Sequence, residues 1–281
     1  MPPVSLVVCV FRERDLLERL LKETRDCYDE LLVLHDTPDV QQVRGLVEGA
    51  GGRFFETPPA AHQEPHWPFA WQQASNDWVL RFDADEFPSE EMKAWLRAFR
   101  RSPEPAPGLS GYTCVWPLWN GRRMVTKKWP AGRFFLFHKQ RVRFFGMSEQ
   151  SPIPDGKVET VDCILCHQPR RKSYGMGNLL FRKKAHIWRV TLARDLLGKP
   201  ADLPGWRWPP DADWPATWQA IRQRPLRTAL YRLLIETLRC LRDQWRREKR
   251  FMPMAALSGP VYHAMLCVTY WRLRRRSAQK H

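Results

Sequence analysis

The first part of the chain alternates short apolar runs with segments whose apolar residues recur at helical spacing. Apolar runs predict four buried strands, at Val4–Val10, Glu30–Leu34, Arg53–Glu56 and Trp78–Phe82. Helical spacing predicts helices around Leu16–Leu21, Val40–Glu48 and Pro68–Ser75. Strands that alternate with helices predict an α/β fold, in which a mostly parallel sheet carries helices on both faces.

The pattern changes twice further along the chain. Residues 111–167 show short strands rich in Trp, Phe and Val, with turn signals at Asn120-Gly121 and Asp155-Gly156. After residue 170 the pattern becomes helical and basic. We therefore predict an α/β domain over residues 1–170 and a C-terminal helical, basic extension over residues 171–281.

Charge is distributed unevenly between these two parts. The net charge is +16, yet residues 1–169 contain 21 Lys and Arg against 23 Asp and Glu, and residues 170–281 contain 25 against 7. Such segregation indicates a polyanionic partner of the extension, either nucleic acid or an anionic membrane surface.

The extension also contains an apolar helical face, which favours the membrane. Leucines at spacings of three and four, from Leu226 to Leu241, are followed by Trp245 and interspersed with arginines. This composition is typical of a basic amphipathic helix that lies in a membrane interface.

The segment Phe251–Trp271 contains no charged residue over 21 positions. Pro253 and Gly259-Pro260 interrupt it, so we expect a re-entrant or interfacial hairpin rather than a span. An ordinary helical subdomain is the alternative. The chain opens without a secretory signal, so we expect a cytoplasmic protein that is peripheral or monotopic on the inner face of the cytoplasmic membrane.

Two carboxylates follow the fourth predicted strand. Asp83 and Asp85 are separated by one residue, so strand alternation directs both side chains to the same side. Paired oxygen ligands suit a hard divalent cation, Mg²⁺ or Mn²⁺, which is able to stabilise a departing diphosphate. The alternative is an acidic turn that caps the next helix, which Ser89-Glu90-Glu91 would begin.

The chain resembles family 2 glycosyltransferases of the A-type nucleotide-sugar fold. The resemblance rests on Ser5–Glu13, Leu32–Asp36 and, most specifically, Phe82–Glu86. It implies a nucleotide-sugar donor bound by the first turn through Val10, Arg12 and Glu13. It also implies that Asp36 contacts the base, Asp83 the ribose and Asp85 the metal.

Within that family, the sequence is similar to bacterial lipopolysaccharide-core glucosyltransferases. Gly132–Phe137, Met147–Glu149 and Leu165–His167 resemble their later motifs. This implies a lipid-linked or cell-envelope glycan as acceptor. We expect Glu149 to be the general base, with Asp155 and Glu159 as the next candidates. Arg133 is expected either to neutralise the diphosphate or to form a structural ion pair, and His167 is expected to be a metal ligand.

Three alternatives remain on the sequence alone. A nucleic-acid-binding protein would explain the basic extension, although its apolar face argues against this. An inactive scaffolding subunit of a glycan-assembly complex would keep the fold without the activity. The motif Cys163-x-x-Cys166-His167 fits covalent haem attachment, but it lies in the predicted strand Val161–Cys166.

Overall fold

The computed structural model describes most of the chain, and it divides into two compact units. The described residues are 1–11, 13–36, 39, 42–60, 62–144, 146–147, 150–170, 177, 183–198 and 215–279. The first unit extends from Met1 to Ser173 and the second from Tyr174 to His281.

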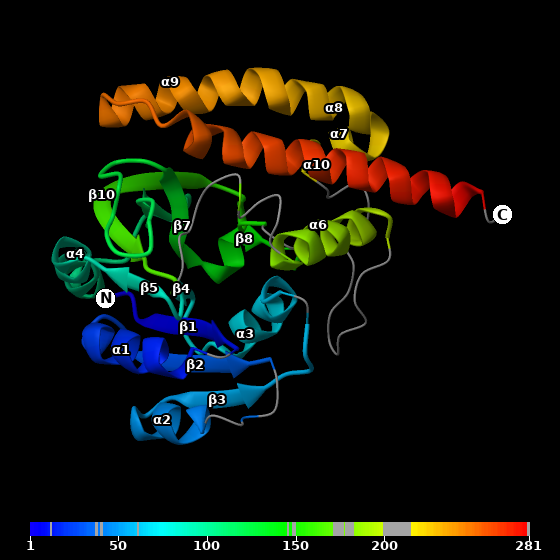
Figure 1. Ribbon diagram of the computed structural model, residues 1–281. Coiled ribbons are helices and arrows are strands. Elements are labelled where there is room, and N and C mark those ends of the chain that lie inside the picture. The colour runs from blue at the N-terminus through cyan, green and yellow to red at the C-terminus, as the bar shows by residue number, and fades with distance from the viewer. Residues whose placement is uncertain are drawn as a thin grey trace. The chain divides into compact units, whose positions relative to one another are not determined.

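The first unit is built on an eight-stranded sheet with the order β3-β2-β1-β4-β7-β6-β10-β5 (Figure 1). Its strands are β1 (Val4–Val10), β2 (Glu30–His35), β3 (Arg53–Glu56), β4 (Trp78–Asp83), β5 (Glu86–Pro88), β6 (Leu109–Val115), β7 (Ala131–His138) and β10 (Lys157–His167). The first four of these pair in parallel, as do β6 and β10, whereas β7 and β5 pair only in antiparallel fashion. A separate ribbon joins β8 (Val142–Arg143) to β9 (Ile153–Pro154).

Helices cover both faces of this sheet because the side chains of β1 alternate between two cores. Even-numbered residues such as Leu6 and Val8 pack in one core with apolar residues of α1, α2 and α4. Odd-numbered residues such as Val7 and Cys9 pack in the other core with α3. The helices are α1 (Arg14–Thr24), α2 (Val43–Gly49), η1 (Glu64–His66), α3 (Trp67–Gln73), α4 (Glu90–Arg101) and η2 (Lys139–Arg141). The predicted α/β fold is thus confirmed.

One predicted helix begins later than expected. The sequence pattern predicts a helix from Val40, whereas α2 begins at Val43. The carboxylate of Asp39 accepts hydrogen bonds from the backbone N–H groups of Val43 and Arg44, both at 2.8 Å. It therefore satisfies donors at the start of α2 that have no partner within the helix.

The second unit is helical in its described part. It contains α6 (Lys183–Leu196), α7 (Ala216–Gln223), α8 (Pro225–Tyr231), a π-helical turn η4 (Arg232–Glu236), α9 (Thr237–Glu248) and α10 (Pro253–Ala278). Helix α10 packs against α6, α8 and η4, and Leu266 and Cys267 on it are fully buried.

The expected hairpin in Phe251–Trp271 is wrong, because these residues belong mostly to the single helix α10. Pro253 lies in the first turn, where a missing N–H is tolerated. Pro260 lies inside the helix and is buried. The packing of α10 against its neighbours compensates for the backbone hydrogen bond that Pro260 removes. Among the described residues, no helix combines the length and the apolar character that crossing a membrane requires.

Candidate functional site

The carboxyl ends of β1, β2 and β4 meet at one edge of the sheet. Strands β1 and β4 pair with Cys9 opposite Asp83, and β1 and β2 pair with Val10 opposite His35. The backbone N–H of Asp36 donates a hydrogen bond to the carbonyl of Val10 at 3.4 Å. Polar side chains that follow these strands are therefore gathered at the edge where open α/β sheets bind their ligands.

Asp83, the last residue of β4, is fixed through both carboxylate oxygens. Gln63 Nε2 donates to Oδ1 at 2.8 Å, and Arg133 Nη2 donates to Oδ2 at 3.1 Å. Burial opposes ionisation, but the positive charges of Arg133 and Arg81 outweigh it, so the pKa of Asp83 is lowered. The side chain retains 20% exposure. Asp83 is thus an oriented anion that a ligand is able to reach.

Glu86 lies at the centre of the hydrogen bonds around Asp83 and is fully buried. Its carboxylate accepts the backbone N–H of Asp83 at 2.8 Å, the indole N–H of Trp116 at 2.7 Å and Nη2 of Arg133 at 2.9 Å. Burial raises the pKa of Glu86, and the charge of Arg133 offsets this only in part. The structure therefore gives Glu86 a supporting role, to which the sequence analysis assigned none.

Asp85 has a different neighbour, His167. Asp85 Oδ2 and His167 Nε2 are 3.4 Å apart, and their side chains are 21% and 18% exposed. The imidazole of His167 stacks on Trp116, with ring centroids 4.3 Å apart and planes inclined by 12°. Strand β5 pairs with β10 so that Glu86 is opposite His167. This pairing explains how residues far apart in the sequence come together.

The residues present fit a divalent cation that completes its coordination from a bound ligand. Carboxylate oxygen suits Mg²⁺ and Mn²⁺, and imidazole nitrogen is a ligand of first-row transition-metal ions. In the part of the chain that the structure describes, no three His, Cys, Asp or Glu side chains form a complete metal centre. Asp85 and His167 therefore offer two ligands, and phosphate oxygens and water would supply the others, as is common for Mg²⁺ bound with phosphates.

The segment before α3 supplies side chains that the sequence analysis missed. Gln63 contacts Asp83, and beside it His62 Nδ1 lies 3.0 Å from Glu64 Oε2. On β4, Arg81 is a further such side chain; it is buried, with its guanidinium 4.7 Å from the centre of the Trp67 ring. No periodic pattern or motif marks His62, Gln63 and Glu64, and the predicted strand Trp78–Phe82 gives Arg81 no role, so only the fold reveals that these side chains approach the site.

The predicted nucleotide-binding residues of the first strands lie at the same edge. Val10 is the buried last residue of β1, and Asp36 directly follows β2. Glu13 accepts a backbone N–H of its own turn at 3.1 Å, so part of its binding capacity is used within the turn. Arg12 and the predicted base Glu149 lie outside the described residues.

The two other candidate bases lie away from this site. Asp155 forms an ion pair with Arg143 at 2.8 Å, and both side chains are about half exposed. Glu159 precedes His167 by eight residues on β10, which corresponds to roughly 25 Å along an extended strand. Neither carboxylate is therefore positioned beside Asp85.

Arg133 is engaged in ion pairs within the site. It pairs with Asp83 and Glu86, and its guanidinium carbon lies 5.5 Å from the centre of the Trp116 ring. Its side chain is only 15% exposed. Of the two roles considered for Arg133, the geometry favours the structural ion pair.

The Cys-x-x-Cys-His motif lies on strand β10. Cys163 is buried, Cys166 is half-buried, and the ring of His167 is stacked on Trp116. The motif therefore contributes to the sheet and to the site through His167, and its place on a strand agrees with the sequence-based expectation.

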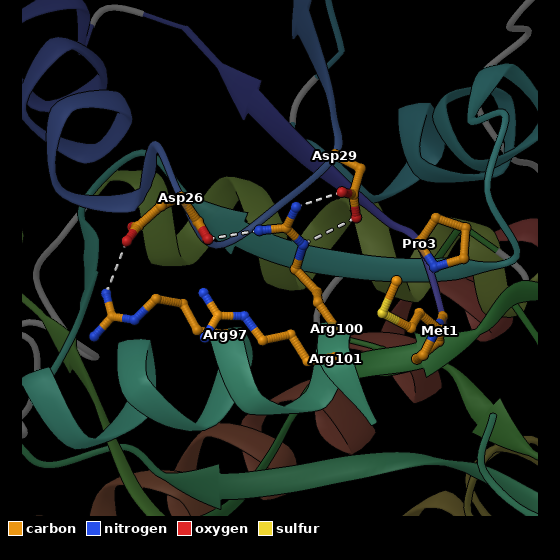
Figure 2. Close-up of a pocket in the computed structure, with 8 residues that line it drawn as sticks. Met1, Pro3, Asp26, Asp29, Arg97, Arg100 and Arg101 are labelled. Carbon is orange, nitrogen blue, oxygen red and sulfur yellow. Dashed lines mark hydrogen bonds and ion pairs between the residues drawn. The ribbon is translucent and has the colours of Figure 1, made fainter. Parts of the chain in front are cut away.

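A separate pocket of about 450 Å³ opens where β1 begins, at the other end of that strand (Figure 2). Arg97 pairs with Asp26 at 3.0 Å, and Arg100 pairs with Asp29. Each of these two carboxylates is therefore paired with an arginine of α4, and none of the residues predicted for the site lines this pocket.

Trp116 is expected to support both Glu86, through its indole N–H, and His167, through ring stacking. In Trp116→Phe the stacked ring is retained, but the buried carboxylate of Glu86 loses a donor, so we expect a destabilisation of about 1–3 kcal/mol in urea unfolding. Trp116→Leu removes the ring as well, and we expect the affinity for Mn²⁺ in the presence of a donor to fall about tenfold further.

Trp119→Phe is the matched control, because the indole of Trp119 donates to the carbonyl of Pro169 at 3.0 Å, in a different loop contact. Equal losses of Mn²⁺ affinity in the Phe and Leu variants of Trp116 would contradict a role for the ring in positioning His167.

No protein-family model and no curated protein matches this sequence. Solved structures do show distant similarity. The mannosyltransferase PcManGT from Pyrobaculum calidifontis, in complex with GDP-Man and Mn²⁺, is similar with a TM-score of 0.47 and 13% identity, over 96% of this chain and 86% of that one. S. aureus TarS 1–349 in complex with UDP-GlcNAc is similar with a TM-score of 0.46 and 12% identity, over 97% and 92%.

A third solved structure also shows this distant similarity. It is 4-diphosphocytidyl-2C-methyl-D-erythritol synthase from Anaerococcus prevotii, with a TM-score of 0.39 and 14% identity, over 58% of this chain and 89% of that one. These similarities are too distant to assign a role to any residue, so the roles proposed below rest on the geometry of the site and on the motifs of the sequence.

Proposed function

We propose that this protein is a metal-dependent glycosyltransferase that moves a hexose from a nucleotide-sugar donor to a glycan acceptor. The observation that carries the proposal is that the two aspartates at the end of β4 have different partners. Asp83 is held by Arg133 and Gln63, whereas Asp85 lies 3.4 Å from His167. Asp83 is thus oriented for hydrogen bonding, and Asp85 forms with His167 a pair of ligands suited to a cation.

In this proposal the donor lies along the carboxyl edge of the sheet. Asp36, after β2, contacts the base, and Asp83 accepts hydrogen bonds from the ribose hydroxyls. Asp85 and His167 hold Mg²⁺ or Mn²⁺. When bound, the cation would neutralise the charge that develops on the diphosphate as it leaves.

The reaction proposed is a single displacement with inversion. The acceptor hydroxyl oxygen forms a bond to the anomeric carbon while the bond from that carbon to the diphosphate oxygen breaks, and the hydroxyl proton passes to a base. Glu149 remains our candidate for the base on the sequence resemblance alone.

We further propose a lipid-linked or cell-envelope acceptor, as in lipopolysaccharide or polysaccharide synthesis on the inner face of the cytoplasmic membrane. The basic, apolar surface of the second unit supports this, because a soluble donor has to meet an acceptor held at a bilayer.

A panel of nucleotide sugars, with and without Mn²⁺, tests the donor and the metal. A ligand that binds only the folded protein raises the free energy of unfolding, by about 2.7 kcal/mol at a hundredfold excess over Kd, and therefore raises Tm. We expect one nucleotide sugar to raise Tm only when Mn²⁺ is present. No shift with any donor, combined with a shift on adding RNA or DNA, would instead support a nucleic-acid-binding protein.

A further inference from the structure

A row of leucines in the second unit is exposed to solvent. Leu226, Leu230, Leu234 and Leu238, here called the leucine stripe, are 49%, 59%, 56% and 63% exposed. They follow one another along α8, the π turn η4 and α9. Single exposed leucines are ordinary on protein surfaces, but a contiguous apolar row marks an interaction surface.

The π turn keeps the leucine stripe on one side of the helix. An α-helix has 3.6 residues per turn, so side chains spaced four apart rotate by about 40° at each step. The stripe would therefore wind around a regular helix. The wider turn at Arg232–Glu236 rotates less per residue and offsets this drift. Leucines on either side of the π turn are thereby brought onto a common face.

An exposed aromatic pair continues this surface. Trp245 and Phe251 stack with centroids 4.8 Å apart and planes inclined by 16°, although they are 46% and 56% exposed. The turn that carries them is fixed, because buried Gln244 accepts the backbone N–H of Met252 at 2.5 Å. Rigid, exposed aromatic rings of this kind are typical of membrane–water interfaces.

An arginine-lined groove of about 620 Å³ lies on the same helices, between α7, α8 and η4. Arg232 and Arg239 both pair with Glu236, at 3.2 and 3.4 Å. Within the described residues, Arg224 and Arg227 of the groove form no ion pair with an acidic side chain. The groove therefore carries excess positive charge, and guanidinium groups bind phosphate oxygens through paired hydrogen bonds.

We propose that these helices dock on an anionic bilayer, with the leucine stripe and aromatic pair inserted among the lipids and the arginines of the groove, on the neighbouring side of the same helices, holding the phosphate of an acidic phospholipid. Residues Pro225–Arg250 contain eight Lys and Arg against three Asp and Glu. This charge complements an anionic leaflet, and the apolar row between the charges distinguishes a bilayer from nucleic acid. The inference does not depend on the proposed sugar transfer.

Co-sedimentation of the full-length protein with vesicles tests the proposal. We expect binding to vesicles of phosphatidylcholine that contain phosphatidylglycerol, and little binding to phosphatidylcholine alone. The variant Arg224→Gln/Arg227→Gln should bind at least about tenfold more weakly, since each surface arginine contributes roughly fivefold. The control Arg25→Gln/Arg101→Gln removes the same charge from exposed positions of the first unit and should bind as the wild type does.

The leucine stripe is tested by Leu230→Asp/Leu234→Asp, with Ile187→Asp on α6, which is 39% exposed, as the control. We expect the stripe variant to lose at least about tenfold in vesicle binding and the control to lose none. Because these positions are exposed, the unfolding temperature and any donor-induced shift should be unchanged, which separates this test from that of the proposed function.

Several results would overturn the proposal. These are equal binding to neutral and anionic vesicles, vesicle binding that survives the stripe variant, or loss of oligonucleotide binding in the arginine variant without any vesicle binding. Light scattering that shows a wild-type dimer and a monomeric stripe variant would identify a second copy of the chain as the occupant instead.

Discussion

Replacing Asp85 with Asn should abolish Mn²⁺-dependent donor binding and lower turnover by roughly 100- to 1,000-fold or more. Asn has nearly the same shape as Asp but lacks the charge that a divalent cation requires. His167, whose Nε2 lies 3.4 Å from Asp85 Oδ2 in the wild type, is then the remaining ligand of the pair. Calorimetric titration of the donor, with and without Mn²⁺, measures the loss of the metal-dependent part.

Two variants show whether this effect is specific. His167→Asn should weaken Mn²⁺ binding by about tenfold while leaving Asp85 in place. Asp155→Asn changes an aspartate of the first unit that pairs with Arg143 away from the site, and it should behave as wild type. Unchanged dependence on Mn²⁺ in Asp85→Asn would mean that the two aspartates form a structural turn and cap.

Replacing Arg133 with Met should destabilise the first unit by about 3–5 kcal/mol, because it leaves buried carboxylates without their cation. Arg133 pairs with Glu86, whose side chain has no exposure, and with Asp83. Met preserves much of the volume, so the loss reports charge rather than packing. Urea unfolding at neutral pH, followed by far-ultraviolet circular dichroism, measures it.

A double variant separates the lost ion pair from other effects. Glu86→Gln/Arg133→Met removes the uncompensated charge and should recover part of the stability. Arg100→Met is the matched surface control, since Arg100 pairs with Asp29 where both side chains are partly exposed. It should lose no more than about 1 kcal/mol. A similarly small loss in Arg133→Met would contradict the buried pairing.

The parallel half of the sheet was predictable from the sequence because buried strands read as continuous apolar runs. Val4–Val10 was predicted as a strand and is β1, with every residue buried. The two aspartates at the end of β4 could likewise be found, because a pair of carboxylates where an apolar run ends can be recognised in the sequence alone. Strand order was less accessible, since β7 and β10 join the sheet through long-range pairing.

The supporting residues of the site could not be predicted by the same reasoning. Trp116 follows β6, Gln63 precedes η1, and neither belongs to a periodic pattern or a motif. Their importance arises from contacts made across the fold, at 2.7 Å to Glu86 and 2.8 Å to Asp83. Helix α10 was missed for a related reason. Its prolines locally indicate an interruption, whereas packing against neighbouring helices keeps Pro260 within one continuous helix.

The antiparallel pairing of β5 with β10 also has a consequence for the order of folding. Asp85 is synthesised early, but its neighbour His167 arrives only after about eighty further residues, so joining them closes a long loop and is slow. A nascent chain that has left the ribosome only as far as β7 already contains both aspartates but lacks His167. Ligand-binding competence should therefore appear late in translation, when the last strand of the sheet docks.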